Sequence, residues 1–372
     1  MYFTVSKKDF YNGLSVVARA ISNYSPLPAF SGIKIEANTD ELILTGSDSD
    51  ISIQTVIRNQ DDCKLSIKDN GAIVIEARYI LEIVRKTESD EIEFEIIDNA
   101  LTKISGNGAE FKINGMKATD YPAIDFSKPK EVFSFEGHLL KQIIAQTAFA
   151  TSDKETRPVL TGVNFHAAAG KLNCVGTDSY RLAKKELKID SALSFNITIP
   201  AKSLAEVSKI VEDEDLVEIA VNDKKAQFMI NSTIIQTRLI DGAYPETERL
   251  IPTSYEYELS MNAHDLLGAI DRASFIKNDG VSVIKLSLDE KECILSTKAL
   301  EVGSSTEVLA GAIFKGEHLE ISCNGRYVFD AIRALEGESV IFKFCGEMKP
   351  FIIKAAGDDD VLQLVLPVRT YA

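Results

Sequence analysis

The sequence predicts an α+β fold in which one unit of antiparallel strands and two helices occurs three times. A strand-like segment followed by a helical pattern recurs at nearly constant intervals along the 372 residues. Repeats of fixed length indicate one structural unit that is used several times. Between the helices lie alternating runs such as Glu91–Ile96, and period-two alternation is typical of half-buried antiparallel strands.

The first element of the unit is a short strand that leads directly into a helix. Such a strand starts near Phe3, again 130 residues later at Phe133, and after a further 126 residues at Leu259. Each is followed by apolar residues three and four apart, which form one face of a helix. We therefore expect helices over residues 7–20, 138–150 and 264–277.

The second element is a pair of strands joined by an acidic turn. The segments Gly46–Ser49 and Gly176–Ser179 lie 130 residues apart and place an aspartate at the same position. Aspartate in this setting usually bonds to its own backbone, so we interpret Asp48 and Asp178 as turn-forming residues rather than a catalytic pair. The third copy, Val283–Leu286, keeps the alternation but has no glycine.

The third element is a second helix with a basic residue at its second position. We expect these helices over residues 77–87, 201–210 and 325–335, whose starts are 124 residues apart in each case. The unit then closes on Tyr121-Pro122, Tyr244-Pro245 and Leu366-Pro367. These anchors predict domains over residues 1–128, 129–253 and 254–372, docked without flexible linkers.

The composition describes a chain with ample material for several cores but not a general nucleic-acid binder. Apolar residues make up 45% of the sequence, and 41 Lys and Arg against 56 Asp and Glu give a net charge of −15. Domains that bind nucleic acid are usually basic, so any DNA contact must be confined to a locally basic surface.

The sequence also predicts a cytoplasmic protein without a membrane segment. Its first residues lack the pattern of a secretory signal, and no apolar run approaches the ~20 residues that span a bilayer. The five cysteines are scattered and never spaced as C-x-x-C, which favours reduced thiols.

No motif predicts catalysis, a metal site or a cofactor. The four histidines lie far apart, and the phosphate-loop, dinucleotide, zinc-protease and nucleophile-elbow patterns are missing from the sequence. The run Gly357–Asp360 carries three carboxylates, but we interpret it as a solvated turn rather than a cation site. We therefore expect a protein that is not an enzyme.

Positive charge is concentrated on the expected helices. They hold thirteen Lys and Arg against six Asp and Glu, a net charge of +7, which leaves −22 for the rest of the chain. Any one of these residues could belong to an ordinary solvated helix face, but the set suits helices that line a hole around duplex DNA and contact phosphates without reading bases. The DNA-facing candidates are Lys7, Lys8, Arg19, Arg78, Arg85, Lys141, Lys202, Lys209, Arg272, Arg326 and Arg333.

Over its whole length the sequence resembles the bacterial sliding clamp family, the β subunit of DNA polymerase III. The resemblance rests on the triplicated unit and on the segments Gly176–Leu182, Asp241–Pro245 and Leu366–Arg369. It implies that two three-domain chains pair head to tail as a ring around duplex DNA, with sheets outside and helices inside. Such a homodimer gives processivity to the replicative DNA polymerase without catalysing a reaction.

The resemblance also implies a hydrophobic pocket for short peptides between the second and third domains. Its partners would be the replicative polymerase, the clamp loader, and other replication and repair proteins. Position-matching assigns to this pocket Leu160, Thr177, Tyr180, Arg181, Leu182, Pro245, Arg249, Leu250, Asn324, Tyr327, Leu364, Val365, Leu366, Pro367, Val368 and Arg369. We expect peptide anchors to enter a cleft formed by Leu182, Leu250, Val365 and Leu366.

Across the seam between chains, the resemblance implies that Phe111 and Ile113 pack against Phe275 and Ile276. Three departures from the family stand out. Tyr180 occupies a position where other members have histidine, the turn Asn23–Pro26 lacks an arginine, and the tail Thr370–Ala372 continues past the pocket motif.

Two other functions compete with this interpretation. A repeat-built adaptor that binds no nucleic acid would be favoured by a monomer in solution. A hydrolase or metal-dependent enzyme would be favoured by metal-stimulated turnover.

Overall fold

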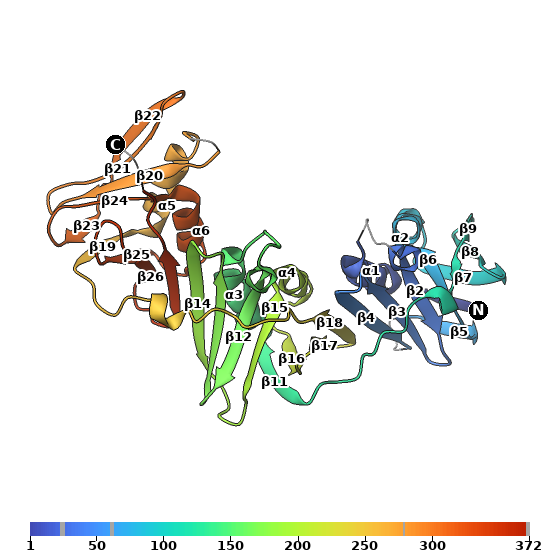
Figure 1. Ribbon diagram of the computed structural model, residues 1–372. Coiled ribbons are helices and arrows are strands. Elements are labelled where there is room, and N and C mark those ends of the chain that lie inside the picture. Colours follow the sequence, from blue (N-terminus) through green and yellow to red (C-terminus); the bar gives the residue numbers. More distant parts are fainter. Residues whose placement is uncertain (23–26, 60–62, 278–279, 370–372) are drawn as a thin grey trace. The chain divides into compact units, whose positions relative to one another are not determined.

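The computed structural model describes residues 1–22, 27–59, 63–277 and 280–369. The turn Asn23–Pro26 and the tail Thr370–Ala372 lie outside these residues. The chain divides into two compact units (Figure 1), one formed by Met1–Lys141 with Lys202–Leu239 and the other by Gln142–Ala201 with Ile240–Ala372. The second repeat contributes to both units.

The three predicted strand–helix pairs are present. They are β1 (Tyr2–Ser6) with α1 (Lys7–Val17), β11 (Glu131–Glu136) with α3 (Gly137–Thr147), and β19 (Tyr257–Asn262) with α5 (Ala263–Ala273). The helices are shorter than expected at their C-terminal ends. Two of them continue as 3-10 turns, η1 (Ala18–Ala20) and η4 (Ala148–Ala150), so Arg19 lies just beyond α1 rather than within it.

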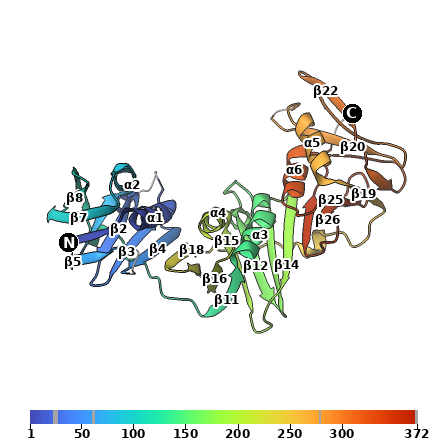
Figure 2. The ribbon, with the colours of Figure 1, turned by 180° about the vertical axis from the view of Figure 1, so that it is seen from behind.

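The three second helices also start where the repeat predicts. They are α2 (Ala77–Lys86), α4 (Ala201–Ile210) and α6 (Gly325–Arg333), with Arg78, Lys202 and Arg326 at their second positions. In the first unit, α1 and α2 lie side by side over the sheet (Figure 2). The fold is therefore α+β with three copies of one unit, as the sequence predicts.

The first unit contains a nine-stranded and a five-stranded antiparallel sheet. The nine-stranded sheet joins five strands of the first repeat to four of the second, in the order β10 (Met116–Lys117), β6 (Gly71–Glu76), β2 (Gly32–Ala37), β3 (Glu41–Ser47), β4 (Ile51–Arg58), β18 (Thr233–Arg238), β17 (Lys225–Ile230), β16 (Leu216–Val221) and β11. The five-stranded sheet has the order β5 (Ser66–Asp69), β1, β7 (Glu91–Asp98), β8 (Leu101–Gly106) and β9 (Ala109–Asn114).

The second unit contains a nine-stranded and a four-stranded antiparallel sheet. Its nine-stranded sheet joins four strands of the second repeat to five of the third, in the order β15 (Phe195–Pro200), β12 (Gly162–Ala168), β13 (Lys171–Thr177), β14 (Arg181–Lys188), β27 (Val361–Val365), β26 (Phe351–Ala355), β25 (Ser339–Phe344), β19 and β23 (Ile313–Lys315). The four-stranded sheet has the order β22 (Gly303–Val308), β21 (Cys293–Ala299), β20 (Val283–Leu288) and β24 (Leu319–Asn324).

Four further 3-10 turns complete the described elements. They are η2 (Pro28–Ser31), η3 (Ala118–Asp120), η5 (Pro158–Thr161) and η6 (Glu248–Leu250). η6 lies in the segment that connects the second repeat to the third.

Each repeat packs its helices on one face of its strands through apolar side chains. In the first repeat, Phe3 and Phe94 stack at 4.8 Å between ring centroids, and Phe10 of α1 meets the ring of Phe3 edge-on at 5.8 Å. All three side chains are fully buried. Aromatic rings dominate such cores because each buries a large apolar area in a defined geometry.

Two repeat-equivalent glycines let a strand approach the end of the first helix. A Cβ at Gly46 would lie 2.2 Å from the carbonyl oxygen of Val17, and one at Gly176 would lie 2.3 Å from that of Thr147. No side chain fits at those distances. This close approach explains why glycine recurs 130 residues apart.

The acidic turns are formed as predicted. Asp48 Oδ1 accepts hydrogen bonds from the backbone N–H groups of Asp50 and Ile51, and Asp178 Oδ1 accepts them from Tyr180 and Arg181. The two carboxylates thus hold their own turns, which confirms their interpretation as turn-forming residues. Within the described part of the chain, no helix is long and apolar enough to cross a membrane.

Candidate functional site

An apolar cluster lies on one face of the nine-stranded sheet of the second unit, where the second repeat meets the third. Leu182 of β14 and Leu364 of β27 are opposite each other in the strand pair and form its floor with Val175 and Ile352. Partly buried side chains pack against that floor, among them Leu366. Two distant parts of the sequence therefore supply one continuous apolar surface.

The predicted cleft differs from this cluster at Val365. Side chains alternate along an extended chain, so Leu364 of β27 and Leu366 just after it lie on one face of the sheet and Val365 on the other. Val365 is 1% exposed and belongs to the core of the third repeat. It is a core residue rather than a wall of the cleft.

Exposure separates side chains that a ligand can touch from those that support them. Leu182 and Leu364 are 2% and 1% exposed, whereas Leu250 on η6 is 51% exposed and Tyr180 is 63% exposed. Leu366 is half-buried. Leu366 and the partly buried Tyr244, Ile251 and Leu362 cover this closed floor, while Leu250, next to Ile251 in the chain, and Tyr180 are exposed.

The remaining matched residues divide in the same way. Leu160 and Thr177 are buried, Pro245 is half-buried, and Arg249 is exposed and pairs with Glu246 at 3.3 Å.

The C-terminal segment is held at the junction by backbone bonds to both repeats. The Leu366 N–H donates to the carbonyl oxygen of Tyr180 at 3.0 Å, and the Val368 N–H donates to that of Ser322 at 2.8 Å. Pro367, which has no N–H to donate, forms an isolated bridge with Cys323. Arg369, the last described residue, is exposed.

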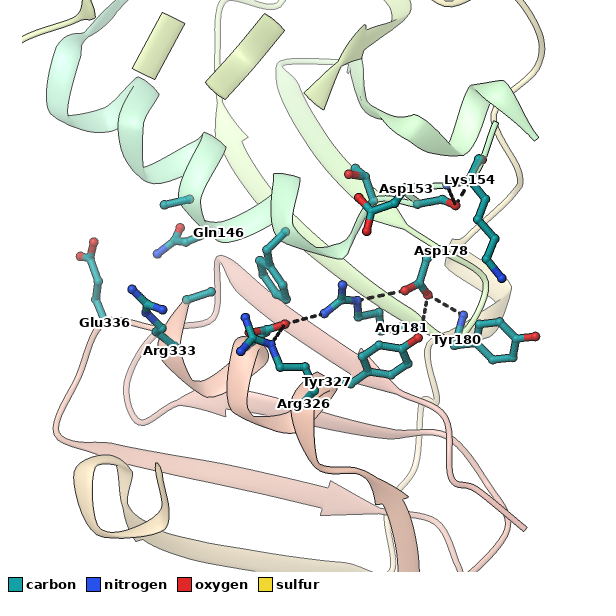
Figure 3. A pocket seen from close by; sticks show the side chains of 16 residues that line it. Gln146, Asp153, Lys154, Asp178, Tyr180, Arg181, Arg326, Tyr327, Arg333 and Glu336 are labelled. Carbon is teal, nitrogen blue, oxygen red and sulfur yellow. Dashed lines mark hydrogen bonds and ion pairs between the residues drawn. The ribbon is translucent and has the colours of Figure 1, made fainter. Parts of the chain in front are cut away.

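On the helix side of the same sheet lies a cavity of about 790 Å³ (Figure 3). It brings together Tyr180, Arg181 and Tyr327 from the predicted pocket with Arg326 and Arg333 from the predicted DNA-facing set. Asn324 instead lines a neighbouring cavity of about 360 Å³ next to Tyr327. The residues matched to the predicted pocket therefore do not line a single cleft. They lie on both faces of the sheet, around the paired ends of β14 and β27.

Arg181 is the most connected side chain in this cavity. Its guanidinium donates to Asp178 Oδ2 and to Asp330 Oδ2, both at 3.0 Å, and lies 4.5 Å from the centre of the Tyr327 ring. Figure 3 shows the bond to Asp178, with Tyr327 beside it. The Arg181 side chain is only 13% exposed. Its charge is thus compensated within the chain and is not presented to a ligand.

Most of the predicted DNA-facing side chains are at the surface, and nine of the eleven are exposed while Lys7 and Lys141 are half-buried. Seven form ion pairs within the described residues, namely Arg19, Arg78, Arg85, Lys141, Lys209, Arg272 and Arg326. Lys7 donates to the carbonyl oxygen of Thr87 at 2.7 Å. Among the described residues, Lys8, Lys202 and Arg333 have no carboxylate partner, so they are the basic groups most available to an external phosphate.

The six α-helices of the described residues hold eleven Lys and Arg against six Asp and Glu. The excess is smaller than the sequence predicts because Arg19 and Lys277 fall outside the helix ends. The sign of the charge on the helices is still positive.

The residues proposed for the seam differ in accessibility. Phe111 and Ile113 are half-buried on β9, an edge strand of the five-stranded sheet, and Phe275 is 69% exposed just past α5. Ile276 is only 3% exposed, so in this structure it is buried in its own unit and is not offered to a partner.

The described residues contain no group of three or more His, Cys, Asp or Glu side chains that could hold a metal ion. In the acidic run near the C-terminus, Asp359 pairs with Lys354 at 3.1 Å, and Asp358 Oδ1 accepts a bond from the Asp360 N–H. All five cysteines are free thiols, and burial raises the pKa of Cys323 to about 12.

Three residues that contact Arg181 in this cavity were not predicted from the sequence as functional. Phe149, Asp178 and Asp330 line the cavity and surround Arg181. The repeat is the only sequence feature that could have drawn attention to these three residues. Each occupies a position that can be compared with the equivalent positions in the other two repeats.

Three family models match the chain in sequence order. They are described as the N-terminal, central and C-terminal domains of the DNA polymerase III beta subunit, and they match residues 1–125, 134–246 and 248–369. Together they account for nearly all of the sequence.

Individual relatives match over the whole length. The beta sliding clamp of Bacillus subtilis (strain 168) is 39% identical over 378 residues, and that of Staphylococcus aureus (strain N315) is 38% identical over 376, with 100% of both chains covered in each case. The crystal structure of the Bacillus subtilis sliding clamp matches with a TM-score of 0.96 at 38% identity and full coverage of both chains. A sliding clamp from Bartonella birtlesii, solved bound to griselimycin, matches with a TM-score of 0.94 at 28% identity, again over both complete chains.

Proposed function

Because the chain belongs to the DNA polymerase III beta subunit family, we propose that it is a DNA sliding clamp that encircles duplex DNA and tethers the replicative polymerase. The observation that carries this proposal is the match of all three domain models in order, together with a TM-score of 0.96 over the full length of a sliding clamp. In this proposal the domains span residues 1–128, 129–253 and 254–372.

The strand order supports closure into a ring by two chains. Each nine-stranded sheet is built across two consecutive repeats, through the pairs β4–β18 and β14–β27. The four-stranded sheet of the third repeat ends on β22 and the five-stranded sheet of the first ends on β9, and among the described residues each of these strands has one free edge. Joining β22 to β9 of a second chain would complete a nine-stranded sheet. Like the one in the second unit, it would have four strands from one repeat and five from the next.

The existing pairs also predict the register of that seam. Ile51, the first residue of β4, is opposite Thr237, and Arg181, the first residue of β14, is opposite Val365. By equivalence, Gly303 at the start of β22 is expected opposite Ile113 of the partner subunit. The contact is heterologous, and two copies close it into a two-fold ring.

Retention on DNA would then come from topology rather than affinity. A dimer of two chains at −15 carries a net charge of −30, which opposes capture of DNA from solution. Basic helices on the inside of the ring would contact phosphates without base preference. A closed ring on circular DNA cannot leave without opening.

The apolar site at the junction of the second and third domains is proposed to receive short peptides from the polymerase, the clamp loader and other replication and repair proteins. Leu250, Leu366 and Tyr180 would contact the apolar anchors of the peptide, above the floor of Leu182 and Leu364. The griselimycin-bound relative supports the proposal, because it is a clamp of this family that holds a ligand.

The protein is proposed to act without catalysis and in the cytoplasm, where bacterial DNA is replicated. Tethering raises the local concentration of polymerase at the primer end, so no new chemical group is needed.

The test combines the assembly state with topology. Native mass should give a dimer, and the protein loaded on nicked circular DNA should remain bound at salt that strips it from the same DNA after linearisation. A monomer at micromolar concentration, or equal loss from circular and linear DNA, would rule out a closed ring.

A further inference from the structure

Consecutive repeats are joined not only by strand pairing but also by an arginine that reaches across the junction. At the second junction, Arg181 of β14 bonds to Asp330 of α6 at 3.0 Å. At the first junction, Arg19 of η1 pairs with Glu206 of α4 at 3.4 Å. Glu206 and Asp330 are equivalent, because each is the sixth residue of its helix.

The two arginines, in contrast, are not equivalent. Arg19 is the second residue after α1, and the second residue after α3 is Phe149. Arg181 opens β14, and the residue that opens β4 is Ile51. At the first junction the arginine follows the first helix and an apolar residue opens the strand, whereas at the second junction the two residue types are interchanged. The acidic residue that the arginine contacts stays at the same helix position in both.

The turn that carries Arg181 does not need the arginine. The turn before Ile51 has the same carboxylate bonds from Asp48, and Ser49 and Ser179 have similar positive φ angles of 87° and 80°. Because the turn forms equally well in front of isoleucine, the guanidinium of Arg181 has another role.

We propose that Arg181 is a positioning residue that fastens the second repeat to the third, and that Arg19 has this role between the first and the second. The side chains of Arg181, Asp178 and Asp330 are 13%, 12% and 14% exposed. Removing Arg181 takes the guanidinium from both buried carboxylates and leaves Asp330 with only the exposed Arg326 as a partner, which is destabilising, whereas exposed pairs contribute little. Arg19 is 39% exposed and its bond is longer, so its link is the weaker one.

The link lies directly beneath backbone that forms the peptide site. Tyr180 precedes Arg181, and its carbonyl oxygen accepts the hydrogen bond from Leu366 at the end of the strand pair. Tyr327, whose ring packs on the Arg181 guanidinium, comes from the other repeat. Loss of the link should therefore free the end of the strand pair and loosen the walls of the site.

The chain provides a matched reporter pair for this local opening. The Leu366 N–H donates to Tyr180 O at 3.0 Å, and at the first junction the Arg238 N–H donates to Asp50 O at 2.9 Å. Hydrogen exchange of these two amides reports opening at each junction separately. Arg181→Ile installs the residue that the first repeat has at this position, and it should speed exchange at Leu366 by about tenfold or more and leave Arg238 unchanged.

The repeat also supplies a rescue. Phe149→Arg in the Arg181→Ile background copies the first junction onto the second, and it should bring exchange at Leu366 back to within about threefold of the parent protein. Arg326→Gln is the control, because Arg326 bonds to the same Asp330 but is 70% exposed, and it should change exchange by less than about twofold.

Unchanged exchange at Leu366 in Arg181→Ile would overturn the proposal, and so would a folded double variant without rescue. Should Arg181→Ile fail to fold, Asp330→Asn removes the link from the helix side and must raise exchange in the same way. A second readout, the affinity for a Gln- and Leu-containing clamp-binding peptide, should fall and recover in parallel. That readout rests on the proposed function. If the parent protein binds no such peptide, the proposed site fails while the exchange data still decide the link.

Discussion

Replacing Phe275 by alanine tests the proposed seam between chains through one accessible side chain. Burying a phenylalanine completely contributes ~1.5–3 kcal/mol. Phe275 is 69% exposed in the isolated chain, so about two thirds of that, ~1–2 kcal/mol, remains to be gained at each seam. A ring has two seams, and the loss of ~2–4 kcal/mol corresponds to a dimer that dissociates about 30- to 1000-fold more readily.

Sedimentation velocity over a range of concentrations measures this change. Ile313→Ala is the matched control, because Ile313 is 63% exposed on β23, outside the proposed seam, and its replacement should leave the dimer constant unaltered. Ile276 is unsuitable for the test because its burial makes any substitution a test of the third repeat itself. A Phe275→Ala dimer as tight as the parent protein would refute the seam.

Three further substitutions test the peptide site, the basic helices and the close approach at the repeated glycine. Leu366→Ala should lower the affinity of a clamp-binding peptide by about 30-fold in fluorescence anisotropy, the effect of ~2 kcal/mol typical of a central anchor contact, and an unchanged affinity would remove the peptide from this surface. Lys202→Gln should reduce the loading of the clamp on DNA more than Lys209→Gln, because Lys209 is paired with Glu206 at 2.7 Å, and equal effects would show that the pairing does not matter. Gly176→Ala should lower the melting temperature strongly, because its Cβ would lie 2.3 Å from a carbonyl oxygen. Gly108→Ala is the control: Gly108 has a φ of 81° and open space around it, so this substitution should lower the free energy of unfolding by only about 1 kcal/mol and shift the melting temperature less. Similar shifts in melting temperature for the two variants would contradict the crowding at Gly176.

The sequence was sufficient for the repeat and for the starts of its helices. Each first helix begins where a short apolar strand ends, and the same spacing places the starts of α1, α3 and α5. The ends of these helices could not be predicted as well, because the last turn narrows to a 3-10 turn after α1 and α3 without a proline or glycine to mark it. Arg19 was assigned to a helix for that reason.

The site was harder to predict because β27 is buried on both faces. Where one face of a strand is solvated, alternation of polar and apolar residues shows which side chains point inward. The strand Val361–Val365 is apolar at four of its five positions, so its sequence does not distinguish Leu364 at the site from Val365 in the core. The ionic link was hidden for a different reason: Asp330 resembles any acid on a helix surface until the fold places Arg181 beside it.

The proposed third junction, between chains, lacks the equivalents of this link. The second residue after α5 is Phe275, the residue that opens β22 is Gly303, and neither carries a charge. The acid at the sixth position of α2 is Glu82, and Arg85 and Lys86 in the same helix lower its pKa to about 2. Glu82 is thus already paired inside its own chain.

The proposed seam should consequently depend on apolar contact and strand pairing rather than on ion pairs. On β9, Glu110 and Lys112 pair with each other at 3.0 Å, and Glu307 of β22 pairs with Arg272. Salt screens attraction between exposed charges, but it also screens the repulsion between two chains of net charge −15. Raising the salt concentration from 50 to 500 mM should therefore leave the dissociation constant of the dimer unchanged or lower it. A dissociation constant that rises about tenfold or more over this range would show that ion pairs across the seam hold the ring closed.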